Sequence, residues 1–251
     1  MISLHPYSVE KLKYIEKSGI QSILFNAVDG NNMNVMDRLN YISPFYSPVA
    51  TYCSMGCAMS HIKVWESFLQ TNMDYAFIME DDVVFDECNL EEYIADAIKQ
   101  AEDFDILMLG YFKSIIFNVV FYPLFGKSNI CLGTHAYILS RTGAEKLLKE
   151  LKGNVWCPID FSIQWLVSRG KIKRTLVENR IIFQTSTDEL KSSTNIQHIS
   201  PVFLYRFLGK FHVDKYLRLS YLFYGSIIRI GDFNINIIYI LIVIILLFIL
   251  S

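Results

Sequence analysis

Three adjacent carboxylates, Glu80, Asp81 and Asp82, follow directly on the apolar run Tyr75–Met79. That run predicts a buried strand, and three like charges at its end repel one another unless a cation lies between them. Carboxylate oxygens suit Mg²⁺ or Mn²⁺, and an ion held by one or two of them can bridge the phosphates of a nucleotide. The sequence therefore predicts a divalent-cation site that serves a diphosphate leaving group; the alternative is a solvated acidic turn.

A second cluster, GCAMSH at residues 56–61, predicts the opening of a helix. Its small residues allow close approach to the backbone, and free N–H groups there can face an anion. His61 would then contact a phosphate or a sugar, unless it is an ordinary core or surface histidine. Cys53, Cys57 and His61 also share a helical face, but structural zinc normally needs four ligands and no second Cys/His pair is present. A zinc site is therefore rejected.

The third candidate is Asp160, which lies in the stretch WCPIDF at residues 156–161, before a predicted amphipathic helix. Burial among apolar neighbours would raise the pKa of this carboxyl toward that of a useful general base. An aspartate in front of a helix is equally suited to an N-cap. Both interpretations stay open on the residues alone.

These side chains need a scaffold, and the apolar spacing predicts strands that alternate with helices. The expected strands cover residues 2–4, 20–27, 75–79, 105–109 and 132–139, and the expected helices cover 8–18, 56–69, 91–101 and 142–151. Residues 28–32 read as a turn, and the next twenty residues, with Pro44 and Pro48, read as a loop. This order predicts a mostly parallel sheet with helices on both faces, which binds ligands beyond the carboxyl ends of its strands.

Length and charge exclude some classes of protein. The 251 residues carry a formal net charge of −2, so no positive field attracts nucleic acid, and a nucleic-acid partner is not expected. The five cysteines are scattered in a chain large enough to fold without disulfides, and they read as reduced thiols. The first residues lack a basic and apolar leader, so the N-terminal domain is expected in the cytoplasm.

The C-terminal end changes character. Residues 201–236 hold five Lys or Arg against two Asp, a net charge of +3, and residues 237–250 are apolar without a break. Read from residue 233, eighteen residues span roughly 27 Å as a helix against a hydrocarbon core of about 30 Å. The chain therefore divides into a catalytic domain over 1–200, an aromatic and basic membrane-surface segment over 201–232, and a hydrophobic membrane tail over 233–251.

Taken in order, several segments resemble glycosyltransferase family 25, which includes bacterial lipooligosaccharide galactosyltransferases and collagen galactosyltransferases. They are FNAVDG at 25–30, GCAMSH at 56–61 with Trp65, IMEDDV at 78–83, GTHAYILSRTGAEKLL at 133–148 and PID at 158–160. The resemblance covers about residues 1–200. It implies a GT-A-like, Rossmann-type fold and an inverting transfer of a hexose, galactose first, from a UDP-sugar to a lipooligosaccharide, lipopolysaccharide or related surface glycan.

The resemblance also implies roles for the site residues. Glu80 and Asp82 would hold Mn²⁺ or Mg²⁺, with Asp82 essential for catalysis, and Asp160 would be the base that takes the proton of the acceptor hydroxyl. Asp81 would orient the ribose or the sugar. Further substrate contacts are expected from Asp29, Gly30 and His61, whereas Tyr137 and Arg141 are expected to be structural.

With a glycolipid acceptor, the tail places the expected enzyme on the cytoplasmic face of a bacterial inner membrane. Two alternatives have been weighed. A membrane-anchored metal-dependent phosphatase would need an aspartate nucleophile where Glu80 stands. A non-enzymatic tail-anchored adaptor would have no use for carboxylates clustered at the end of a strand.

Overall fold

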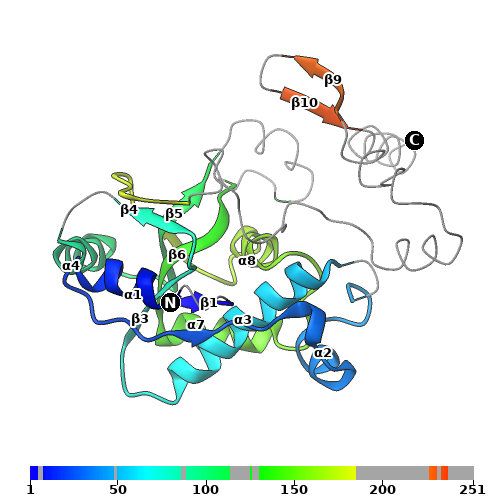
Figure 1. Cartoon of the computed structure of the whole chain (residues 1–251), viewed down its shortest axis with the longest axis horizontal. Helices are drawn as coiled ribbons and strands as arrows, with labels where there is room; N and C mark the ends of the chain where they lie inside the picture. Colours follow the sequence, from blue (N-terminus) through cyan, green and yellow to red (C-terminus); the bar gives the residue numbers. More distant parts are fainter. Residues whose placement is uncertain are drawn as a thin grey trace, which may run out of the picture. The chain divides into compact units, whose positions relative to one another are not determined.

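The computed structural model describes residues 1–4, 8–47, 50–85, 89–113, 125, 130–184, 226–230 and 233–236 (Figure 1). Its contacts divide the chain into two units, residues 1–47 with 52–194, and residues 48–51 with 195–251. The helices of the first unit are α1 (Ser8–Glu16), α2 (Val35–Tyr41), α3 (Tyr52–Leu69), α4 (Leu90–Ala101), α7 (Arg141–Leu151) and α8 (Ile159–Ser168), with a short 3₁₀ helix η1 (Gly30–Asn32). Its strands are β1 (Ile2–Ser3), β2 (Phe25–Asn26), β3 (Tyr75–Met79), β4 (Val83–Phe85), β5 (Ile106–Phe112), β6 (Leu132–Ser140), β7 (Arg174–Leu176) and β8 (Ile182–Gln184).

The central sheet has the order β3-β6-β5-β7. Strand β6 runs antiparallel to both β3 and β5, while β5 and β7 are parallel. Strands β1 and β2 form a separate parallel pair. This pair lies next to the end of β3, because Ile2 of β1 forms a parallel bridge with Glu80. The fold is α/β as predicted, but the sheet is mixed and not mostly parallel, since an apolar run reads alike in either chain direction.

Helices cover both faces of this sheet, with α1 and α4 on one side and α3 and α8 on the other (Figure 1). Alternation along the strands sends Leu107 of β5 and Ile138 of β6 into one apolar core with Leu90 and Ala97 of α4. Tyr137 of β6 points to the opposite face, toward α3. Strand β6 therefore supplies the core on one face and side chains of the site on the other.

Most expected elements are present, with three corrections. The strand expected over residues 20–27 is limited to Phe25–Asn26. The loop expected after residue 32 contains α2, whose start is capped by the Asn34 side chain accepting from the Asp37 N–H. The helix expected from Gly56 begins four residues earlier, at Tyr52. Gly56 therefore lies one turn inside α3, where its N–H belongs to the hydrogen-bond ladder of the helix and cannot face an anion.

In the second unit the structure describes an antiparallel pair, β9 (Ser226–Ile230) with β10 (Phe233–Asn236). The first four residues of the expected membrane tail are thus strand. Residues 237–251 and most of the expected membrane-surface segment lie outside the described residues. Among the residues that are described, no helix is long and apolar enough to cross a membrane.

Two glycines let the turn at residues 28–30 approach α3 closely. A Cβ on Gly30 would lie 1.8 Å from the carbonyl oxygen of Tyr52, and one on Gly56 would lie 2.5 Å from that of Val28. Ser60 secures the contact, because its hydroxyl accepts from the Val28 N–H at 2.8 Å and donates to the Gly56 carbonyl at 2.7 Å. The small residues of 56–61 therefore serve the packing of a turn on a helix.

This contact predicts the effect of Gly56→Ala. In an ordinary helix interior the change stabilises by roughly 0.5–1 kcal/mol, but here the methyl group meets backbone, and we expect a loss of about 1–3 kcal/mol. Thermal unfolding measures it. Ser67→Ala at an exposed position of α3 is the control, expected within about 0.5 kcal/mol of wild type. A Gly56→Ala variant as stable as wild type would contradict the close approach.

Candidate active site

The three carboxylates lie in the turn between β3 and β4. Strand β3 is fixed in the sheet through its partner β6, and directly after it the Glu80 N–H donates to the His135 carbonyl at 2.9 Å. The antiparallel register brings the start of β6 to the end of β3, with Met79 opposite Ala136. Residues 133–137 and the carboxylates are consequently neighbours, although more than fifty positions separate them in the chain.

Glu80 is held from two sides. Its Oε1 accepts from the Thr134 hydroxyl at 2.8 Å and lies 3.1 Å from His61 Nε2. Burial alone would raise the pKa of Glu80, but the hydrogen bonds from His61 and Thr134 outweigh it and lower the pKa below its usual value. Glu80 is therefore a partly buried carboxylate that stays ionised.

The imidazole of His61 is itself fixed by two aromatic residues. Its Nδ1 lies 2.8 Å from the Tyr137 hydroxyl, which also accepts from the Trp65 indole N–H at 2.8 Å. Because the indole can only donate, the hydroxyl proton is left for Nδ1, and the Nε2 proton then points to Glu80. His61 is 1% exposed, so in this geometry it acts on Glu80; a substrate contact of His61 stays a prediction.

Asp81 and Asp82 have separate partners. Asp81 Oδ2 accepts from the Ser3 hydroxyl of β1, and Asp82 Oδ2 accepts from the Gln184 amide of β8 at 2.6 Å. Burial first, and then the charges of Glu80 and Asp81, raise the pKa of Asp82 to about 6. Three carboxyl groups thus lie close together in this turn, and oxygen ligands that repel one another suit a divalent cation such as Mn²⁺ or Mg²⁺.

Asp160 is the second residue of α8, and Pro158 is the N-cap residue. The N-cap alternative is therefore wrong for Asp160. Its carboxylate instead joins α8 to β6, because Oδ2 accepts from the Gly133 N–H at 3.1 Å while Oδ1 accepts from the Phe161 N–H at 2.8 Å. Burial, reinforced by the charge of Glu80, raises the pKa of Asp160 against these hydrogen bonds. A carboxylate with a raised pKa suits a general base.

Asp29 and Gly30 have structural tasks. Asp29 caps η1, with Oδ1 accepting from the Asn31 N–H at 2.9 Å and Oδ2 accepting from the Asn32 amide. Gly30 is buried beneath the first residue of α3. Both hold the turn against the helix that carries His61, and their contact with substrate stays a prediction.

Cys57, His61 and Glu80 form a compact triad, with one metal-ligand type atom from each within 4.8 Å of the others. Burial and the charge of Glu80 raise the pKa of the Cys57 thiol well above its usual value, so the thiol stays neutral. Both ring nitrogens of His61 are already engaged. A hard cation that prefers oxygen is therefore better served by the carboxylates of the turn than by this triad.

Sequence reasoning missed the residues that hold the carboxylates: Ser3, Thr134 and Gln184. A hydroxyl or amide side chain is common everywhere, and nothing in the local sequence marks it as a partner of a distant acid. Thr134 lies within one of the segments that carry the family resemblance, which was the only available signal.

Comparison with known proteins assigns the chain to a family. The family model described as glycosyltransferase family 25, LPS biosynthesis protein, matches residues 9–163. A glycosyltransferase-like protein of Haemophilus influenzae is 29% identical over 179 residues, which cover 66% of this chain and 61% of that protein.

Of two animal relatives, one is named as a galactosyltransferase and the other as inactive. Procollagen galactosyltransferase 1-B of Xenopus laevis is 24% identical over 145 residues, or 55% of this chain and 24% of the relative. Inactive glycosyltransferase 25 family member 3 of Mus musculus is 28% identical over 156 residues, or 56% of this chain and 26% of the relative. The chain thus spans under two thirds of the bacterial relative and about a quarter of the animal ones.

The raised pKa of Asp82 predicts a stability effect of Asp82→Asn. The folded-state pKa of about 6 lies above the ordinary 3.8, so the wild type loses stability as pH rises from about 4 to above 6. The amide keeps the volume and still accepts from Gln184 but carries no charge. In chelator, we expect the variant to melt higher than wild type at pH 8 and about equally at pH 4.

Thermal unfolding across this pH range measures the difference. Asp74→Asn, at an exposed position before β3, is the matched control and should show no such pH dependence relative to wild type. An advantage of Asp82→Asn that is constant from pH 4 to pH 8 would refute the assigned origin of the shift.

Proposed function

Because this chain belongs to glycosyltransferase family 25, we propose that it transfers a hexose from a UDP-sugar to a surface glycan, with inversion at the anomeric carbon. Galactose is the first candidate for the sugar, supported by the name of the Xenopus relative. A lipooligosaccharide or lipopolysaccharide acceptor is supported by the description of the family. The observation that carries the proposal is the cluster of three carboxyl groups after β3, together with the partly buried Asp160, whose pKa is raised by burial and by the charge of Glu80.

Asp160 is the proposed base. Inverting transfer needs one group that takes the proton from the acceptor hydroxyl while its oxygen attacks the anomeric carbon. The raised pKa of Asp160 makes its carboxylate more basic than a solvated one, and Gly133 and Phe161 hold it in place. No other step is assigned to Asp160, since a single displacement leaves no covalent intermediate on the enzyme.

Asp82 and Glu80 are the proposed ligands of a divalent cation. Such an ion, when bound, neutralises the charge that grows on the departing UDP. The two residues are prepared differently. His61 and Thr134 keep Glu80 ionised and oriented, while burial and the charges of Glu80 and Asp81 raise the pKa of Asp82. Asp81 is proposed to orient the ribose or the sugar from its place beside Ser3.

The apolar run at residues 237–250, after a segment of net charge +3, supports a membrane location. We place the catalytic unit on the cytoplasmic face of a bacterial inner membrane, where the tail would raise the effective concentration of a membrane-embedded glycolipid acceptor. The chemistry of transfer does not depend on this tether.

The function is tested by UDP release from a panel of UDP-sugars, with Mn²⁺, with Mg²⁺ and with chelator. Asp82→Asn should abolish the reaction although the protein stays folded. Wild-type protein that binds no UDP and hydrolyses no UDP-sugar under any of these conditions would contradict the proposal, and would place the chain beside its inactive relative.

Asp160→Asn tests the base. General-base catalysis contributes roughly 10²–10⁴-fold, so we expect kcat to fall by at least about 100-fold while the affinity for UDP changes little. Calorimetric titration with UDP is the internal control, since a variant that merely misfolds would lose UDP binding as well. An unchanged kcat would reduce Asp160 to a link between α8 and β6.

Deletion of residues 237–251 tests the location and leaves β9 and β10 intact. We expect the shortened protein in the soluble fraction with UDP-sugar hydrolysis near normal, and with transfer to a membrane-embedded acceptor reduced far more than transfer to a short soluble one. A shortened protein that still sediments with membranes would assign the anchor to residues 201–232.

A further inference from the structure

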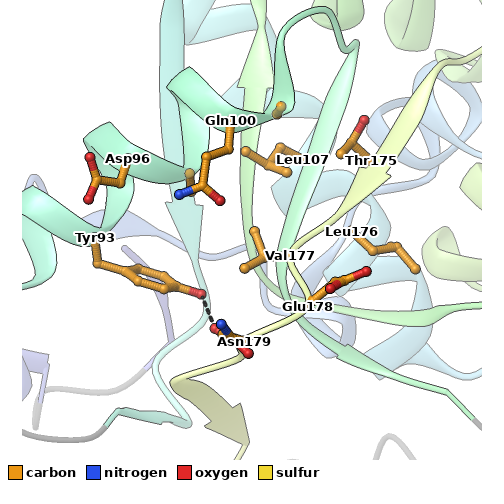
Figure 2. A pocket seen from close by; sticks show the side chains of 11 residues that line it. Tyr93, Asp96, Gln100, Leu107, Thr175, Leu176, Val177, Glu178 and Asn179 are labelled. Atoms are coloured by element: carbon orange, nitrogen blue, oxygen red, sulfur yellow. Dashed lines mark hydrogen bonds between the residues drawn. The ribbon is translucent and has the colours of Figure 1, made fainter.

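A cavity lies on the face of the sheet opposite His61. It has a volume of about 370 Å³ and opens between α4 and the segment that follows β7 (Figure 2). Its floor includes Leu107, which is 1% exposed and belongs to the core on the α4 side of the sheet. Tyr137 points to the other face of the sheet, toward α3, which carries Cys57 and His61. This cavity is therefore separate from the candidate active site.

The walls combine apolar and polar groups in a manner suited to a small neutral ligand. Figure 2 shows the Gln100 amide reaching from α4 into the space between the Tyr93 ring and Val177. Tyr93 is fixed there, because its hydroxyl donates to the Asn179 carbonyl at 3.0 Å and ties α4 to the segment after β7. An amide offers two donors and one acceptor oxygen, so Gln100 can pair with vicinal hydroxyls.

The charge of the lining further restricts the class of ligand that the cavity can bind. Among the described residues that line the cavity, the charged ones are two carboxylates, Asp96 and Glu178, and none is Lys, Arg or His. Phosphate or nucleotide would meet repulsion from these two carboxylates, which no cation of the described lining offsets. An aromatic ring, an apolar floor and amide groups instead match a hexose unit, which presents an apolar C–H face and an edge of hydroxyls. The volume is at the lower end of the range for small-molecule sites, about 300–1,000 Å³.

We propose that this cavity is a non-catalytic binding site for a neutral hexose unit of a glycan. The preference for a sugar over another neutral polyol rests on the proposed function; the exclusion of anions rests on the lining alone. Tyr93 and Val177 would contact the ring carbons of the sugar, and Gln100 would pair with its hydroxyls.

The test uses the full chain in a detergent without a sugar head group. Saturation-transfer NMR and calorimetric titration are run with galactose, lactose and N-acetylglucosamine, and with inorganic phosphate as the anionic probe. We expect at least one sugar to bind and phosphate not to compete with it. Gln100→Ala should weaken the sugar by roughly tenfold, and Ala101→Leu, which fills the cavity, should abolish its binding.

Lys99→Ala, the exposed neighbour of Gln100 on α4, is the matched control and should bind like wild type. UDP-sugar hydrolysis is measured on every variant and should be unchanged. Sugar binding that survives both cavity variants belongs to another site and overturns the proposal, as does the absence of binding to all three sugars. Sugar binding lost in the cavity variants of a protein without UDP-sugar hydrolysis would uphold this site while refuting the proposed transfer.

Discussion

The partly buried charge of Glu80 lies where β3, β6 and α3 meet, and an unpaired charge there would cost several kcal/mol. Thr134 and His61 remove that cost with two hydrogen bonds to one oxygen. Tyr137 then fixes the ring of His61. Since Thr134 and Tyr137 belong to β6 and His61 belongs to α3, the same contacts that keep Glu80 ionised also set the spacing of the sheet and α3.

The charge of Glu80 also affects the pKa values of two other carboxyl groups. Burial first, and then the fixed negative charge of Glu80, raise the pKa of Asp82 and of Asp160, which both follow Glu80 in the chain. One carboxylate that the protein holds through Oε1 thus prepares two others, one for a cation and one for a proton. A solvated acidic turn would not have this division, because water screens like charges and equalises their pKa values.

Much of this could be predicted because the information was local. The apolar run before Glu80 and the helix of α4 follow from periodicity, and the carboxylate cluster is visible in three letters. The direction of β6 could not be predicted, since alternation is the same in both senses of a strand. The start of α3 was missed because Gly56 resembled the opening of a helix. Position 56 instead lacks a side chain because the Val28 carbonyl packs against it, and only the fold creates that contact.

The two faces of the sheet explain why the candidate active site and the cavity beside α4 can coexist in so small a unit. Leu107 of β5 is paired with Ile138 of β6. The preceding residue of β6, Tyr137, points to the other face, toward His61. Adjacent positions of one strand therefore serve different surfaces. A substitution that shifted β6 by one residue would exchange the two faces and destroy both at once, whereas a change on one face leaves the side chains of the other in place. Selection on either surface can then proceed without the other, provided that the register of β6 is kept.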